Sequence, residues 1–187
     1  DELALKSVNR LRNLRDRLGE LARLRKASGR IARHSLIWRS QIAPVVGENE
    51  SAGYLDLLGG SCIMFARAAA ATSSPERRTL VPIVRDLANA LANLAKKLDD
   101  RDARQRAANQ ALEAGRRLSM SNAPPGSTLL TALLVARVVA IDLMVFAGVD
   151  PDEAVAAMRE GTRKPRVSAL PRAPQAPFRL NRRRRDR

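Results

Sequence analysis

Apolar residues recur through most of the chain at spacings of three and four, which is the period of a helix with one buried face. The clearest run consists of Leu80, Val84, Leu87, Leu91, Leu94 and Leu98. A second run, in the opening segment at residues 1–42, consists of Leu11, Leu14, Leu18 and Leu21. Each run predicts a helix that packs along a neighbouring helix.

Proline, glycine and capping residues predict where the first helices begin and end. Pro44 and Gly47 indicate the end of a long opening helix, with a second helix from about Ser51. The sequence Ser73–Glu76 combines a capping hydroxyl, an early proline and an acid, so it predicts the start of a third helix. Pro82 is expected to kink that helix or delay its start.

Similar signals divide the second half of the chain. A fourth helix is predicted at about residues 101–120 and a Pro- and Gly-containing loop at 122–127. A fifth helix is predicted at about 128–147. Asp150, followed by proline and acids, predicts the start of a short helix that ends at Gly161.

The segment 128–147 is apolar on nearly all sides and is long enough to cross a membrane. Inside a bilayer, Arg137 and Asp142 each raise the free energy of insertion by about 2.5–3.5 kcal/mol, while each large apolar residue lowers it by about 0.3–0.6 kcal/mol. The total free energy of insertion is therefore near zero. The neighbouring amphipathic helices need a partner for their apolar faces. We therefore predict that this segment is the buried centre of a bundle.

The composition agrees with a helical fold. The chain has 187 residues, of which 45% are apolar but only 3% aromatic, so the core consists mainly of Leu, Val, Ile and Ala. We predict one all-α, antiparallel helical bundle of about five main helices plus one short helix over residues 1–161. A disordered, Pro- and Arg-rich cationic tail is predicted over 162–187.

The formal charge of +15 is concentrated at the two ends of the sequence. Residues 1–39 contain eleven Lys or Arg and four acids, a net +7, and residues 163–187 contain ten basic residues and one acid, a net +9. The middle of the chain has a net charge of −1. This distribution predicts an anionic partner, either a phospholipid surface or nucleic acid.

The sequence offers little chemistry for an enzyme, a metal site or a cofactor. It has one histidine, His34, and one cysteine, Cys62, so it has neither an internal disulfide nor a zinc pattern, and a reducing compartment is expected. The acids at 99, 100 and 102 are expected to serve the start of the fourth helix instead of binding a cation. We predict that the chain is not an enzyme and uses no cofactor.

Arg137 and Asp142 are the candidate ligand-binding residues, because charge in an apolar helix is costly unless it is paired. Either each meets a partner elsewhere in the bundle, or both line a polar pocket for a small organic anion, with Trp38, Tyr54 and Phe146 as walls. A separate candidate is the run Arg182, Arg183, Arg184 and Arg185, which suits an anionic surface but cannot read a base sequence.

The chain resembles the fusaric acid resistance and aromatic acid exporter family of bacterial membrane proteins over about residues 1–160. The resemblance rests on the long basic opening helix, the Leu-rich stretch Leu80–Leu98, and the apolar helix Leu129–Phe146 with its internal Arg137 and Asp142. Members of the family join a transmembrane helical region to a cytosolic one. The resemblance implies a C-terminal cytosolic domain that follows the last membrane-spanning helix, and it carries over no site residues.

We expect this domain to lie at the cytoplasmic face of the cell membrane and to contact its own transmembrane region and anionic lipid. Its expected role is subunit assembly, regulation of transport, or binding of a small organic anion, and it forms a homo-oligomer in the first case. The alternative is a basic helical protein that binds nucleic acid without sequence preference. A third hypothesis is a module that binds a protein partner through the face of Gly53 and Gly60.

Overall fold

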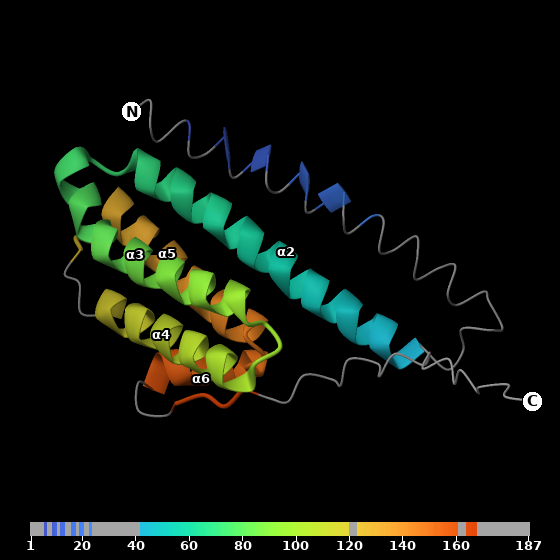
Figure 1. The fold of residues 1–187 in the computed structure, drawn as a ribbon. Helices are drawn as coiled ribbons and strands as arrows, with labels where there is room; N and C mark the ends of the chain where they lie inside the picture. The colour runs from blue at the N-terminus through green and yellow to red at the C-terminus, as the bar shows by residue number, and fades with distance from the viewer. Residues whose placement is uncertain are drawn as a thin grey trace, which may run out of the picture.

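The computed structural model describes residues 42–119, 123–160 and 164–167, together with ten separate residues between Lys6 and Arg23. The described parts contain five labelled helices (Figure 1): α2 (Ile42–Ala71), α3 (Ser74–Lys96), α4 (Arg101–Ser119), α5 (Thr128–Phe146) and α6 (Pro151–Glu160). Apart from one isolated bridge, between Val149 and Val167, these parts contain no β-structure. The predicted all-α helical bundle is therefore confirmed.

Helix α5 is the central element of the bundle. It packs along α2 on one side and α4 on another, and it also contacts α3 and α6. Helix α3 packs mainly on α4, whereas α2 and α3 contact each other little (Figure 1). The prediction of a buried centre holds for the faces of α5 that meet its neighbours, but Leu134 and Val138 on its outer face are exposed.

Small side chains let the central helices approach one another closely. The buried alanines of α4 and α5 are Ala103, Ala107, Ala108, Ala111, Ala114, Ala132, Ala136 and Ala140. Gly115 extends the same surface, because a Cβ atom at this position would overlap the thioether of Met158 on α6. The core therefore consists of leucines set between alanine-rich helix faces.

Helix α2 begins earlier than the sequence indicated. It starts at Ile42 and passes through Pro44 and Gly47 without a break, so the predicted boundary near Ser51 is wrong. Pro44 is tolerated because it lies in the first turn, where backbone N–H groups have no partner within the helix. The opening segment lies largely outside the described residues, and the ten described there are helical.

Helix α3 begins as predicted, with Ser73 before its first turn and Glu76 within that turn, and it runs through Pro82 to Lys96. Only half of its predicted apolar run is buried. The residues that face the core are Leu80, Ile83, Leu87, Ala90 and Leu94. Val84 and Leu91 are exposed, as is Leu98 just beyond the helix, so α3 has a second apolar stripe that no described helix covers.

Three arginines donate hydrogen bonds to carbonyl oxygens at or near the C-terminal ends of helices, where carbonyl groups lack partners within the helix. Arg77 Nη2 donates to Ala70 O in the last turn of α2 and to Thr72 O just after it, at 3.0 and 2.8 Å. Buried Arg104 donates to Ala147 O after α5, at 3.3 Å, and Arg137 donates to Met158 O of α6, at 2.7 Å. The arginines thus fasten the ends of three helices to neighbouring elements.

The segment Lys164–Val167 packs on the bundle as a short strap, although the sequence placed it in the tail. Gln105 of α4 donates to Pro165 O at 2.7 Å and accepts from Val167 N at 2.9 Å. Pro165 and Val167 are buried. The bundle therefore extends to Val167, within the predicted disordered tail, and residues 168–187 of that tail lie outside the described parts.

Arg104→Ala should lower the free energy of unfolding by about 2–4 kcal/mol, because it removes a charged hydrogen bond and leaves a space in the core. Arg104 is 3% exposed. The measurement is urea denaturation followed by circular dichroism. The control is Arg106→Ala, an exposed position on the same helix, where a change below about 1 kcal/mol is expected. Equal losses in the two variants would contradict this role for Arg104.

Candidate functional site

The charged residues of α5 face different helices. Arg137 points to α6, where it donates to Met158 O, while Asp142 lies beside Ser61 and Cys62 of α2. Five helical positions separate their directions by about 140°. The structure therefore places Arg137 and Asp142 on different sides of α5. Arg137 contacts a partner elsewhere in the bundle, which is the first of the two alternatives that the sequence left open.

The other predicted site residues are only partly within the described residues. Tyr54 and Phe146 are partly buried and pack against the core. Trp38 and the arginine run at residues 182–185 lie outside the described residues. At Gly53 and Gly60 an added Cβ atom would meet nothing within 4 Å, so this face of α2 has open space.

Asp142 has the most unusual environment among the described acids. Burial between α5 and α2 raises its pKa above the usual value, and a hydrogen bond with Ser61 opposes part of that rise. Ser61 is 2% exposed, and its hydroxyl lies 3.0 Å from Leu58 O, to which it can also donate. Burial and the negative charge of Asp142 raise the pKa of the neighbouring Cys62 thiol, so this thiol is neutral at physiological pH.

An apolar groove lies where α2 and α3 separate, and we call it the α2–α3 groove. Its walls are formed by α2 residues from Leu58 to Ala70 and α3 residues from Arg77 to Leu91, and Val139 and Leu143 of α5 form its floor. Its volume is about 620 Å³. This volume lies within the range of small-molecule sites, roughly 300–1,000 Å³.

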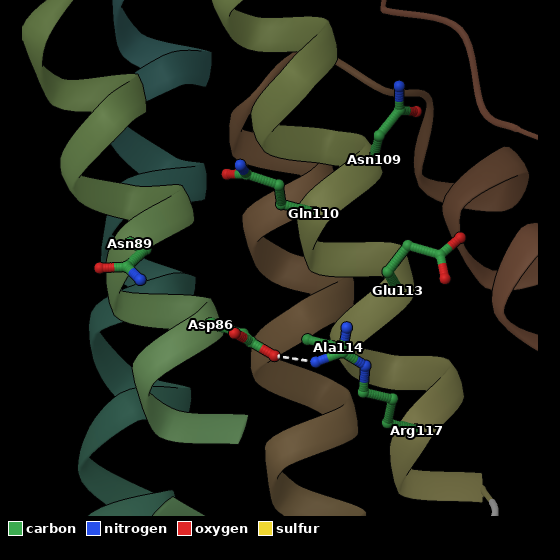
Figure 2. Close-up of a pocket in the computed structure, with 7 residues that line it drawn as sticks. All are labelled: Asp86, Asn89, Asn109, Gln110, Glu113, Ala114 and Arg117. Carbon is green, nitrogen blue, oxygen red and sulfur yellow. Dashed lines mark hydrogen bonds and ion pairs between the residues drawn. The ribbon is translucent and has the colours of Figure 1, made fainter. Parts of the chain in front are cut away.

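A smaller, polar crevice lies between α3 and α4 (Figure 2). It has a volume of about 320 Å³ and is lined by Asp86, Asn89, Asn109, Gln110, Glu113, Ala114 and Arg117. Arg117 Nη1 lies 2.5 Å from Asp86 Oδ2, so an ion pair joins the two helices across the crevice. We interpret the crevice as a solvated seam between α3 and α4, because its charged groups already serve that contact.

The acids near helix starts behave as helix caps. Asp100 Oδ1 accepts from Asp102 N at 2.8 Å before α4, and Asp150 Oδ1 accepts from Asp152 N at 2.9 Å before α6. Within the parts that the structure describes, no group of three or more His, Cys, Asp or Glu residues could hold a metal ion. The contact of Asp100 agrees with the expectation that the acids near residue 100 serve the start of the fourth helix.

The α2–α3 groove was not among the sites predicted from the sequence. Its signal was present, because Val81, Val84, Ala88 and Leu91 form a second apolar stripe on α3 beside the buried one. Periodicity shows that both stripes exist, but it does not tell which of them a neighbouring helix covers. The groove therefore arises only in the tertiary structure, because it depends on how far α2 lies from α3.

Helix α5 is also the single described helix that is long and apolar enough to cross a membrane, and half of its most apolar stretch is buried in the bundle. Its packing against four other helices agrees with a core position. No protein-family model, curated protein or solved structure matches the chain.

Asp142→Asn should raise the melting temperature at about pH 7 and leave it unchanged at about pH 3. Because the pKa of Asp142 is raised on folding, its contribution favours folding below the unfolded pKa of about 3.9 and is lost as the pH rises through the folded pKa. Thermal denaturation across this pH range tests the effect. Asp56→Asn on the exposed face of α2 is the control, and a less stable Asp142→Asn protein at neutral pH would contradict the prediction.

The Asp86–Arg117 pair should contribute about 0.2–1 kcal/mol of coupling, as exposed ion pairs do. A double-mutant cycle with Asp86→Ala and Arg117→Ala measures this term. Raising the salt concentration should weaken it, since both side chains contact solvent. A coupling well above this range would show that the crevice has a larger role than joining α3 to α4.

Proposed function

We propose that the chain is a cytosolic helical domain of a bacterial multi-pass membrane protein and that it lies against the cytoplasmic face of the membrane. The observation that carries the proposal is the position of the two basic segments relative to the bundle. The first precedes Ile42 and the second follows Val167, so both join the described bundle at its boundaries.

These two boundaries lie at the same end of the bundle. Val167 pairs with Val149, directly after the C-terminal end of α5. Helix α2 runs antiparallel to α5, so Ile42 is directed toward that same end (Figure 1). Both basic segments therefore start from one end of the domain.

The charge distribution makes this arrangement suitable for an anionic surface. Residues 42–167 have a net charge of only +2, while residues 1–41 have +7 and residues 168–187 have +6. A basic residue near an anionic leaflet contributes about 1 kcal/mol, and the attraction falls off over about 10 Å. The net charge of the two flanking segments would orient the domain at such a surface, whereas the nearly neutral bundle would do so weakly.

Within such a protein the domain would assemble subunits, regulate transport or bind a small organic anion, as the resemblance to the aromatic acid exporters implies. All three roles need binding and conformational coupling but no covalent chemistry. The reading frame upstream of residue 1 should then encode several apolar spans.

Flotation with liposomes tests the membrane contact. The full chain should float with vesicles that contain anionic lipid and not with neutral ones, and Arg182, Arg183, Arg184 and Arg185 changed together to Gln should weaken binding at least tenfold. The charge-matched control changes four exposed bundle arginines, Arg67, Arg78, Arg106 and Arg159, to Gln. This control should weaken binding less, because these residues belong to the nearly neutral bundle.

Two results would overturn the proposal. Equal losses in the two four-arginine variants would show that net charge, and not its position, drives binding. Absence of flotation together with tight, salt-sensitive binding to duplex DNA would support the nonspecific nucleic-acid alternative.

A further inference from the structure

The α2–α3 groove is open where a closed bundle would be sealed. Its deepest residues include Leu58, Leu80 and Leu87, which also belong to the main core. Val81, Val84 and Leu91 on the α3 side remain exposed. The groove therefore gives access to the interior between the helices, and water covers apolar surface there unless another molecule replaces it.

The dimensions of the groove favour a thin, extended occupant. Its α3 wall runs from Arg77 to Leu91, about 20 Å at the rise of an α-helix. A helix of that length, about 11 Å wide, occupies on the order of 2,000 Å³. The groove holds about 620 Å³, so a helix would lie mostly outside it, while a single acyl chain would fit within it.

The polar groups at the groove have one sign of charge. The charged residues among its walls are Arg77 and Arg85, both on α3. Arg77 is engaged with the Ala70 and Thr72 oxygens, whereas exposed Arg85 has no hydrogen bond or ion pair within the described part of the chain. Apolar walls beside an available guanidinium suit a molecule with an apolar body and an anionic head.

We infer that the α2–α3 groove binds a single-chain anionic amphiphile of the fatty-acid class, with its acyl chain between α2 and α3 and its carboxylate at Arg85. This site is separate from the membrane-facing end of the domain, and it does not depend on the function proposed above. It also differs from the pocket that the sequence suggested around Arg137 and Asp142.

Cys62 provides a built-in reporter of occupancy. It is the one cysteine of the chain and lies in the groove wall. Palmitate, added to the full chain below its micelle-forming concentration, should slow alkylation of Cys62 by N-ethylmaleimide severalfold. Equilibrium dialysis with labelled palmitate should give one saturable site per chain.

Two matched pairs of variants locate the site. Ala88→Phe fills the groove and should abolish palmitate binding, whereas Asn93→Phe, an exposed position about 140° around α3 from Ala88, should not change it. Arg85→Gln should weaken palmitate binding about three- to tenfold and leave hexadecanol binding unchanged, because hexadecanol has no charge. Arg78→Gln, an exposed arginine of α3 outside the groove, is its control.

The inference is overturned if palmitate leaves the alkylation rate of Cys62 unchanged, or if Ala88→Phe and Asn93→Phe bind palmitate equally well. Equal effects of Arg85→Gln on palmitate and hexadecanol would overturn the assignment of the carboxylate to Arg85. Loss of palmitate binding on changing residues 182–185 to Gln would assign it to the basic tail instead. Failure of the flotation experiment would affect none of these outcomes.

Discussion

The fold depends on covering one helix, α5, whose nineteen residues are apolar except for a few positions. No single neighbour can bury such a helix, because each helix–helix contact covers only one sector of its circumference. Helices α2, α3, α4 and α6 divide this task, and the small residues of α4 let α4 and α6 come close. The incomplete cover leaves two exposed areas, the outer face of α5 and the α2–α3 groove.

Arginine side chains then fix the ends of the helices that surround α5. The last carbonyl groups of a helix have no hydrogen-bond donor within the helix, and a guanidinium can donate to several of them at once. Arg77, Arg104 and Arg137 serve the ends of α2, α5 and α6 in this way. Burial lowers the pKa of Arg104, with the nearby Arg101 as a second cause, yet an arginine retains its charge under these conditions. An arginine within an apolar segment is thus not by itself a sign of a ligand site.

Local signals in the sequence predicted most of the helices. Ser73, Ser127 and Asp150 precede α3, α5 and α6, and the predicted starts of these helices agree with the structure. The start of α2 was not predictable from Pro44 alone, because proline is unfavourable inside a helix but harmless in its first turn. The candidate site could not be predicted, since Leu80 and Val84 look alike in the sequence but only Leu80 meets a covering helix.

Helix α2 forms one wall of the groove and is the longest helix in the described part of the molecule. Its thirty residues extend about 45 Å from the end held by Arg77, while Cys62 lies about 15 Å from that end. If α2 tilts about its held end, the far end at Ile42 moves about three times as far as the groove wall. The helix is therefore a lever, and a separation of α2 from α3 by 1 Å at about Cys62 would displace Ile42 by about 3 Å.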